Sequence, residues 1–383
     1  MDAPYAAARE QLDDHLDPRV RVTRSGADRH LLELIVDSQV ASRLTLIDFQ
    51  QQIETVRLRM GGIAAVNTDP AHRFRGHARS LLWHTLGWMR QQGFDLSLLF
   101  GIADFYPKFG YAPAFSTTSL RLAVRDAEQL PAGDLTLAPF NAGRHLDAVL
   151  RIFRRHSHGR TGPIVRDRRT WTPFRKGLNW HTRAVVQVAL DARGRVQGYW
   201  ARDDTPHDVT VLEVGCAAPA VAPAIIRAAG RHGVAERVER IRFVLPPDHP
   251  VMRYATLLGG TQETHHRRDA HAMARLIHVG STLRKLAPLL ATRLPGRGSL
   301  NLKTNLDHVT LRWGDGEFDV SDHPLPGPRV QLPQWALAQL ILGHADVSSL
   351  AALTWIRGSN RALDDLARLF PMKPHHFPVV DEF

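Results

Sequence analysis

The sequence predicts an α+β protein with two successive domains, each a mixed β-sheet flanked by helices, and a smaller α+β domain after them. Two observations support this fold class. An order of several strands, a helix and a further strand occurs twice along the chain, although the residues themselves do not repeat. A third stretch has short strands first and helices afterwards. The length of 383 residues, of which 44% are hydrophobic, allows two or three packed domains.

The first domain is predicted to span residues 1–135. Short segments rich in Leu or β-branched residues indicate strands at 20–24, 31–37, 44–51, 55–60, 61–67 and 96–100. A helix is expected at 76–92, and its apolar side carries Leu81, Leu82, Leu86 and Met89. A short helical turn is expected around Tyr106. This order of elements is typical of a layered domain of sheet and helix.

The second domain is predicted at 136–280 and the third at 281–383. For the second, we expect helices at 145–155, 219–232 and 250–258 and strands at 184–190, 195–201, 209–216 and 240–245. For the third, we expect strands at 300–305, 308–312, 318–320 and 329–332 and helices at 333–342, 347–354 and 360–369. The last six residues, PVVDEF, are apolar for a chain end, which predicts that the end is docked and not frayed.

Composition limits the classes of function. Cys216 is the only cysteine, so an intrachain disulfide and a multi-thiolate metal site are both excluded, and a reducing compartment is indicated. No run of 18 apolar residues occurs, and we expect a cytoplasmic protein with no membrane partner. The net charge is +11, from 49 Lys and Arg against 38 Asp and Glu. That charge leaves nucleic acid, an acidic membrane surface and a phosphate-bearing ligand open as partners.

The most specific pattern lies between an expected strand and an expected helix, where the chain reads Arg73-x-x-Gly76-x-Ala78. Consecutive backbone N–H groups at a helix start, together with the helix dipole, suit a pyrophosphate. Gly76 allows the backbone to approach such a ligand closely. The alternative is an ordinary helix start with solvent-facing arginines, and the motif taken alone does not choose between them.

A second motif follows one helix and one strand later, where residues 105–111 read FYPKFGY. With both motifs, the chain resembles the GNAT superfamily of acetyl-CoA-dependent N-acetyltransferases and, within it, the Eis-like (enhanced intracellular survival) proteins. The resemblance covers nearly the whole chain. It implies tandem GNAT folds, the second degenerate, followed by a domain similar to sterol carrier proteins. It also implies a homo-oligomer, a hexamer in this family.

The resemblance implies a binding site for acetyl-CoA as acetyl donor in the first domain. The implied contacts to acetyl-CoA come from Val66, Asn67, Thr68, Arg73, Phe74, Arg75, Gly76, His77, Ala78, Arg79, Gly101 and Ile102. Tyr106 matches the tyrosine that protonates the departing thiolate. A phenol with a pKa of about 10 can protonate a thiolate whose conjugate acid has a pKa of about 8.5. The alternative for Tyr106 is a core aromatic, an alternative that fits Tyr111 better.

The attacking amine must lose a proton, so a base is also needed. Many acetyltransferases place a glutamate on the strand before the phosphate loop, but 61–67 contains no carboxylate. The resemblance implies that the C-terminal carboxylate of Phe383 is the base. An ordinary chain terminus is the alternative, and Asp381, Glu382 and Glu54 are further candidates.

Other signals are weaker. The histidine pairs at 265–266 and 375–376 lack a metal-binding motif, so no metal is expected. No GxSxG motif occurs, which argues against a hydrolase. In the second domain, prolines occupy the place of a phosphate loop, so one active site per chain is expected.

The segment 151–176 carries nine basic residues and one acidic residue, a net of 9 − 1 = +8. This is either a solvated basic face, a subunit contact, or a surface for nucleic acid or another anion. The resemblance favours a subunit contact, so no nucleic acid partner is expected. The resemblance implies an acceptor amine that is aminoglycoside-like or a peptide or lysine amine. The competing class is a non-catalytic ligand- or anion-binding protein that acts through the C-terminal domain or the segment 151–176.

Overall fold

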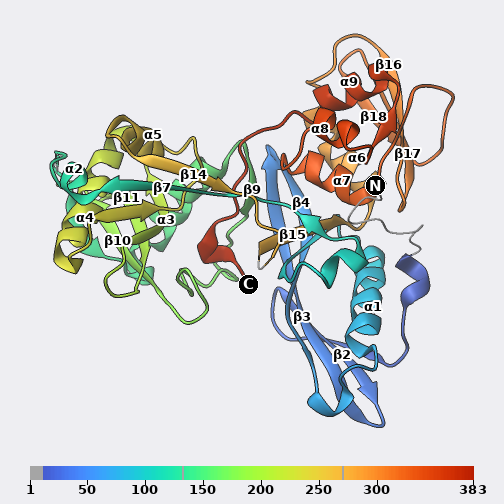
Figure 1. The fold of residues 1–383 in the computed structure, drawn as a ribbon, viewed down its shortest axis with the longest axis horizontal. Helices are drawn as coiled ribbons and strands as arrows, with labels where there is room; N and C mark the ends of the chain where they lie inside the picture. Colours follow the sequence, from blue (N-terminus) through green and yellow to red (C-terminus); the bar gives the residue numbers. More distant parts are fainter. Residues whose placement is uncertain (1–11, 132, 270) are drawn as a thin grey trace. The chain divides into compact units, whose positions relative to one another are not determined.

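The computed structural model describes residues 12–131, 133–269 and 271–383 (Figure 1). These residues divide into two compact units. Unit 1 contains the described residues up to Phe115, Arg267–Lys373 and Phe383, and unit 2 contains Ser116–His266 and Pro374–Glu382. No helix of the described residues is long and apolar enough to cross a membrane.

Unit 1 is built on a mixed sheet with the strand order β1-β2-β3-β4-β5-β15-β6. The strands are β1 (Val20–Arg24), β2 (Arg29–Val36), β3 (Gln39–Glu54), β4 (Val56–Thr68), β5 (Leu96–Gly101), β15 (His271–Leu276) and β6 (Ala112–Pro113). Only β4 and β5 pair in parallel, because the helix α1 (His77–Gln91) crosses over between them. The predicted apolar side of α1 is buried in the core of this sheet, as expected.

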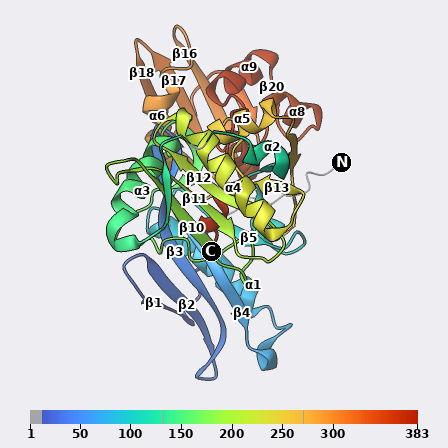
Figure 2. The same ribbon diagram turned by 90° about the vertical axis from the view of Figure 1, so that its left-hand side faces the viewer.

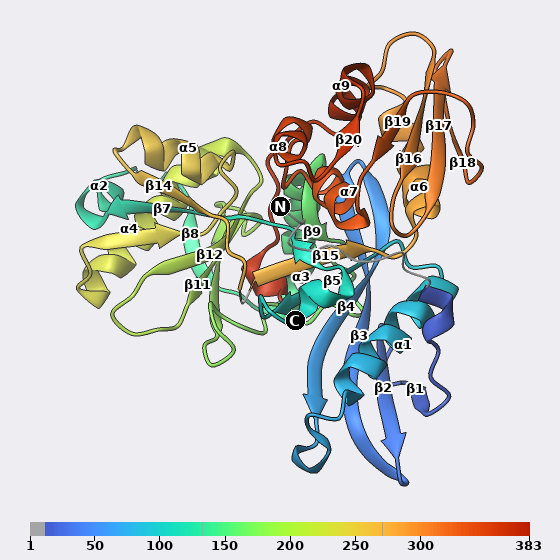
Figure 3. The same cartoon turned by 45° about the vertical axis from the view of Figure 1, so that its right-hand side comes forward.

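The C-terminal part of unit 1 is a smaller α+β layer (Figure 3). Its sheet has the order β18-β17-β16-β19-β20. The strands are β16 (Gly298–Lys303), β17 (His308–Gly314), β18 (Glu317–Ser321), β19 (Arg329–Gln331) and β20 (Arg357–Gly358), and the helices are α6 (Val279–Leu290), α7 (Gln334–Ile341), α8 (Val347–Ala352) and α9 (Asn360–Leu369). All of the predicted strands and helices of this region are present, and α6 and β20 are additional. Its likeness to sterol carrier proteins stays a prediction.

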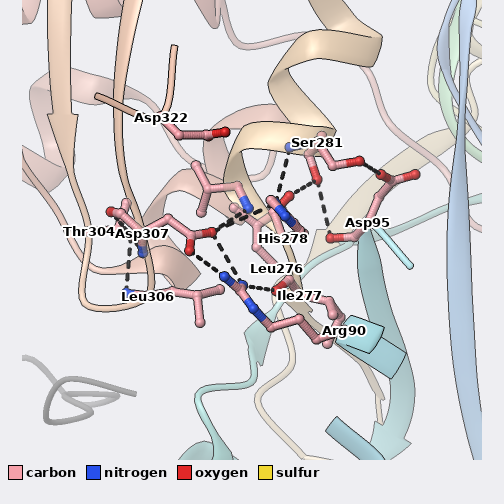
Figure 4. A network of polar contacts seen from close by, with 12 residues as sticks. Arg90, Asp95, Leu276, Ile277, His278, Ser281, Thr304, Leu306, Asp307 and Asp322 are labelled. Atoms are coloured by element: carbon pink, nitrogen blue, oxygen red, sulfur yellow. Dashed lines mark hydrogen bonds and ion pairs between the residues drawn. The ribbon is translucent and has the colours of Figure 1, made fainter. Parts of the chain in front are cut away.

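A polar network joins this layer to the first sheet within unit 1 (Figure 4). Arg90 on α1 donates to Asp307 Oδ1 at 2.7 Å and to the carbonyl oxygen of Ile277 at 2.9 Å. Asp95, which is fully buried, accepts from Ser281 Oγ at 3.0 Å and from Lys285 Nζ at 2.7 Å. The last turn of α1 and the start of β5 are therefore held by α6 and by the loop before β17.

Unit 2 is a second mixed sheet with the order β14-β7-β13-β12-β11-β10-β8. The strands are β14 (Thr261–His265), β7 (Thr117–Ala123), β13 (Arg240–Phe243), β12 (Thr210–Cys216), β11 (Val196–Asp203), β10 (Ala184–Leu190) and β8 (Thr136–Pro139). The strand β9 (Arg160–Ile164) also lies within the residues of unit 2 but is not part of this sheet. The helices are α2 (Val124–Glu128), α3 (Ala142–Ser157), α4 (Ala222–Glu236) and α5 (Pro250–Leu257). As in the first sheet of unit 1, one strand–helix–strand crossover, β12-α4-β13, gives the one parallel pair among these strands.

The helices α3 and α4 cover opposite faces of this second sheet (Figure 2). Tyr199 and Trp200 are neighbours on β11, so their side chains point to opposite faces. Tyr199 lies in the core cluster that contains α3, and Trp200 lies in the cluster that contains α4. This is the sheet flanked by helices that the sequence predicts.

The two units do not follow the three predicted domains. The residues of strand β7 fall in the predicted first domain, but the strand pairs with β13 and β14 in the sheet of unit 2. Strand β15 falls in the predicted second domain, but it pairs with β5 and β6 in the sheet of unit 1. A strand's residues determine whether it is buried but not which sheet it joins, and nearly all of β15 is buried.

The two expected strands at 55–60 and 61–67 are one continuous strand, β4. The two glycines at 61–62 interrupt the apolar pattern, and the sequence therefore favours a break there. In the structure Gly61 and Gly62 are buried and leave room for neighbouring side chains. A Cβ at residue 62 would lie 2.5 Å from Phe383 Cζ, and one at residue 61 would collide with Met89. The glycines thus permit close packing and do not end the strand.

Candidate active site

In the first sheet of unit 1, the parallel strands β4 and β5 separate at one end. Pairing between β4 and β5 runs from Met60 and Leu96 to Ile63 and Leu99. Beyond Ile63, β4 continues to Thr68 and stays paired with β3. The register of β3 against β4 shifts just after this point, and Ala65 has a positive φ of 51°. Such a bulge turns the backbone of residues 66–68 away from β5, which leaves an edge to which an extended ligand can bind.

The connection from β4 to α1 has an irregular backbone. Asp69 accepts from the backbone N–H of Ala71 and caps a short turn, Pro70–His72. Phe74 has a φ of 62° and its side chain is fully exposed, and Gly76 has a φ of 79°. A positive φ at a residue as bulky as phenylalanine is strained. The sequence motif gave no signal of this conformation at Phe74.

The helix α1 begins at His77, with Gly76 as its N-cap residue and no side-chain cap. The first backbone N–H groups of a helix have no partner inside the helix, and they carry the positive end of the helix dipole. Arg73 comes just before the helix start and Arg79 lies in its first turn, so two cations are close to these groups. The local potential is positive and suits an anion.

A pocket of about 440 Å³ lies at this helix start. It is lined by Val66, Asn67, Thr68, His72, Arg73, Phe74, Gly76, His77, Ala78, Arg79 and Phe105. The structure thus brings the strand end and the loop motif together, as the sequence led us to expect. Arg75, Gly101 and Ile102 were also expected to contact the ligand, but they do not line this pocket.

His72 and Phe105 line the pocket although the sequence analysis did not single them out as contacts. His72 directly precedes the motif, and nothing in its own residue type distinguishes it from the chain's other histidines. The turn Pro70–His72 buries it, leaving 9% of its surface exposed. Only the backbone fold shows that it belongs to the pocket.

Tyr106 lies next to this pocket. It starts a single helical turn, Tyr106–Phe109, and its ring packs edge-on against the pocket residue Phe105 at 5.1 Å between centroids. A Cβ at residue 101 would collide with the Tyr106 ring, so Gly101 provides the space for it. Burial raises the pKa of the Tyr106 hydroxyl. Its hydroxyl makes no hydrogen bond to any residue that the structure describes, so it is available to a ligand.

Tyr111 has a structural role. It is fully buried, and its hydroxyl lies 2.7 Å from Ser97 Oγ, which also hydrogen-bonds to the carbonyl oxygen of Gly61 at 2.8 Å. Of the two tyrosines in the motif, Tyr111 therefore fits the core role that we preferred for it.

The last residue, Phe383, packs against the strands of the unit 1 sheet. Its ring is 5.2 Å from the ring of Phe49 on β3 and 5.3 Å from that of Phe100 on β5. Only 7% of Phe383 is exposed, so the expected docking of the chain end is confirmed. Gly62 and Phe100 flank the point at which β4 and β5 separate. The chain terminus therefore lies at the separation of the two strands.

The other candidate carboxylates are held by cations. Glu54, at the turn between β3 and β4, forms ion pairs with Arg293 and with Lys373. In unit 2, Asp381 pairs with Arg166 at 2.9 Å and Glu382 pairs with Lys176 at 2.5 Å. A proton acceptor role for any of these would compete with its ion pair.

At least four of the nine basic residues of the segment 151–176 form ion pairs inside unit 2. Arg166 is fully buried between Glu213 and Asp381 and lies over the rings of Phe153 and Trp171. Further ion pairs join Arg160 to Asp248, Arg168 to Asp147 and Lys176 to Glu382. The net charge of +8 counts only residues 151–176, whereas the acidic partners lie outside this segment of the chain. The segment is therefore less cationic than its own residues suggest.

The crossover of unit 2 lacks the features of the pocket in unit 1. Pro219 starts a short turn at the end of β12, and Pro223 lies in the first turn of α4. Proline has no N–H, so this helix start offers fewer donors to an anion. The helix α1 of unit 1 has no proline at its start.

Comparison with known proteins agrees with this geometry. Residues 16–114 match the family model of the acetyltransferase (GNAT) domain. No sequence match was found among curated proteins. The fold is similar to three solved structures over most of each chain. A probable N-acyltransferase from Enterococcus faecalis V583 has a TM-score of 0.76 and 15% identity and covers 93% of this chain and 90% of that chain.

The second of these, a GCN5-related N-acetyltransferase from Anabaena variabilis, has a TM-score of 0.72 and 17% identity and covers 93% of this chain and 90% of that chain. The third, Eis1 from Mycobacterium abscessus, has a TM-score of 0.67 and 17% identity and covers 92% of this chain and 91% of that chain. At these identities the likeness shows a shared fold. The pocket at the start of α1 lies within the matched GNAT domain.

Proposed function

Residues 16–114 of this chain are a GNAT acetyltransferase domain, and we propose that the protein transfers an acetyl group from acetyl-CoA directly to an amine. The observation that carries this proposal is the pocket at the start of α1. It combines free backbone N–H groups, the helix dipole and the cations Arg73 and Arg79. The pyrophosphate of acetyl-CoA is an anion of suitable charge for this position.

The remainder of acetyl-CoA would extend from the pocket along the separated strands. The bulged edge at residues 66–68 provides backbone groups that can pair with the amides of the pantetheine arm. The thioester would then lie beside Gly101 and Ile102, at the end of β5. In this arrangement the separation of β4 and β5 provides space for the thioester.

Tyr106 is proposed as the general acid. The amine nitrogen attacks the thioester carbon, the C–S bond breaks, and the sulfur leaves as a thiolate that takes the proton of the Tyr106 hydroxyl. The raised pKa of Tyr106 keeps the hydroxyl protonated before the reaction. Its position beside Phe105 places it at the pocket edge.

The C-terminal carboxylate of Phe383 is proposed as the general base that removes a proton from the attacking amine. An amine is protonated near pH 7 and cannot attack until it loses that proton. An ordinary α-carboxyl has a pKa of about 3.5 and is a weak base in water. Burial among Phe49, Phe100 and Gly62 would therefore have to make this carboxylate a stronger base.

The acceptor class is proposed from the resemblance to Eis-like proteins: an aminoglycoside-like amine or a peptide or lysine amine. A homo-oligomer, a hexamer in that family, is proposed on the same ground. The competing class is a non-catalytic anion-binding protein, but the internal ion pairs of Arg160, Arg166 and Lys176 do not favour it.

Release of CoA from acetyl-CoA, measured with a thiol reagent, tests the proposal. A panel of polyamine antibiotics, lysine peptides and simple amines is supplied, and the acetylated product is identified by mass spectrometry. We expect CoA release that depends on an amine. A folded protein that binds acetyl-CoA but releases no CoA with any amine would favour the binding class instead.

A further inference from the structure

Two histidines face the anion pocket, and neither has its full set of hydrogen bonds. His72 Nδ1 and His77 Nε2 are buried and have no partner among the residues that the structure describes. Their rings meet edge to face at 5.8 Å between centroids. Both line the pocket. A buried polar atom without a partner costs stability, so two such atoms beside a pocket point to a ligand that supplies the partner.

The surroundings of His77 favour its neutral form when no anion is present. Burial lowers the pKa of His77, and the neighbouring His72, Arg19 and Arg75 lower it further. Asp17 raises the pKa of His77, but Asp17 is already paired with Arg19 at 2.8 Å and accepts from Ser80.

On the side of His72, the loop contributes Arg73 to the pocket. Asp69 is the acidic residue of that loop, and its side chain caps the backbone N–H of Ala71. A second positive charge at this helix start is therefore unfavourable until negative charge arrives. An anion in the pocket would instead favour the protonated imidazole.

We propose that His72 and His77 bind the pyrophosphate of a CoA thioester as protonated imidazolium groups, so that the cofactor site takes up protons when it binds its ligand. This rests on the proposed function, adds His72 to its contacts and gives both histidines a proton-linked role. A protonated imidazole donates from both nitrogens, so each ring gains the hydrogen bond it lacks.

The chemistry favours a pyrophosphate over a smaller or neutral group. The anion must be close enough to two rings 5.8 Å apart and to the N–H groups of α1. A pyrophosphate carries two charges that do not titrate between pH 5 and 8. A phosphate monoester, such as the 3′-phosphate of CoA, has a second pKa of about 6 and titrates in this range itself. The two phosphate types can therefore be separated by experiment.

The test is calorimetric binding of 3′-dephospho-CoA to the full-length protein at about pH 5.5 and about pH 7.5, on either side of the ordinary histidine pKa of about 6.5. This ligand keeps the pyrophosphate and lacks the titrating 3′-phosphate. The number of protons taken up is measured from the difference in heat between two buffers of different ionisation enthalpy. Intact CoA is measured in parallel, and the difference reports the 3′-phosphate.

We expect binding about three- to tenfold tighter at the lower pH, because one pKa unit corresponds to a tenfold change. We also expect net proton uptake near pH 6.5. His72→Asn and His77→Asn should each reduce both effects, since asparagine donates a hydrogen bond without titrating. His30→Asn is the matched control: His30 is a half-buried histidine of the same unit outside the pocket, and the variant should behave as the parent.

Unchanged affinity between the two pH values, with no proton uptake, would overturn this inference while leaving the proposed function intact. Absence of binding of any CoA compound at either pH would instead contradict the proposed function. If His72→Asn does not fold, His77→Asn and the proton count of the parent protein still decide the matter. Proton uptake that persists in the folded His77→Asn and His72→Asn variants would also count against the two histidines.

Discussion

Gly62 on β4 is in direct contact with Phe383, the last residue of the chain. A Cβ on residue 62 would lie 2.5 Å from Phe383 Cζ and 3.0 Å from the ring of Phe49. The ring of Phe383 is fixed between Phe49 and Phe100, so it cannot move aside without displacing them. Only glycine at this position allows the chain end to reach the separated strands.

We therefore expect Gly62→Ala to displace Phe383 and lower the rate of acetyl transfer by at least tenfold. The overpacked core should also cost about 1–3 kcal/mol in the free energy of unfolding, measured by urea denaturation. Gly26→Ala is the control. Gly26 is exposed, and its nearest neighbour would be 3.8 Å from the new Cβ. If the Gly62→Ala enzyme is as active as the parent, the position of the chain end is not needed for catalysis.

Extension of the chain beyond Phe383 tests the carboxylate without altering a side chain. Two added glycines move the carboxylate away while the Phe383 ring can keep its site between Phe49 and Phe100. We expect turnover to fall strongly and the affinity for acetyl-CoA to stay within about twofold. The same two residues added at the N-terminus provide the control. Full activity of the C-terminally extended enzyme would refute the carboxylate as base.

Tyr106→Phe should lower the turnover number by about 100-fold or more, the range expected for loss of a general acid. The affinity for acetyl-CoA should change little, because the ring and its contact with Phe105 are kept. Tyr111→Phe removes a hydroxyl that is bonded to Ser97, so it should cost about 1 kcal/mol of stability and leave turnover nearly unchanged. Equal kinetic effects of the two substitutions would contradict the assignment.

The sequence predicted local structure well where residue periodicity sets it. The apolar side of α1 and the arrangement of Arg73, Gly76 and Ala78 at its start follow from residues close together in the chain. The same holds for the short turn Tyr106–Phe109, which Tyr106 begins. These features depend on local geometry, for which one stretch of sequence is sufficient evidence.

Features that depend on distant residues were not predictable. The partners of Arg166 lie 47 and 215 residues away, so the segment 151–176 was read as a cationic stretch although much of it is paired. Strand β15 pairs with β5 and β6, which lie more than 150 residues earlier. The burial of His72 depends on a turn that its own residue type does not signal. Pairing over such separations is set by the whole fold.

The ion pair of Arg90 and Asp307 should stabilise unit 1 measurably (Figure 4). Both side chains are mostly buried, with 19% and 14% exposed, and Asp307 also accepts from the backbone N–H of Val279. A double-mutant cycle of Arg90→Ala and Asp307→Ala should give a coupling of about 1–3 kcal/mol in urea unfolding.

A cycle on Arg297 and Asp315 is the control for that measurement. This pair is as short, at 2.6 Å, but its side chains are 77% and 71% exposed. Surface pairs usually contribute about 0–1 kcal/mol because water and salt screen them. A coupling for Arg90 and Asp307 no larger than that of the exposed pair would mean that the network in Figure 4 does not hold α1 to the C-terminal layer.

His249 should make unit 2 sensitive to acid. Its ring is 3% exposed and stacks on His156 at 5.1 Å. Nδ1 accepts from the backbone N–H of Val251 and Nε2 lies 3.0 Å from the carbonyl oxygen of Val214. The ring therefore fits its site as a neutral group that accepts on one side and donates on the other. Protonation would place a second N–H against the N–H of Val251.

Burial, with the nearby charges of His156 and Arg160, holds the pKa of His249 well below 6.5. Because the unfolded chain takes up the proton near pH 6.5 and the folded chain does not, this contribution to stability is present above pH 6.5 and is lost as the pH falls below it. The expected loss is about 1.4 kcal/mol per pH unit in the free energy of unfolding. His249→Asn should be less stable at about pH 7.5 but lose less on acidification, measured by urea unfolding across about pH 5–7.5. Parallel curves for parent and variant would show that His249 is not the titrating group.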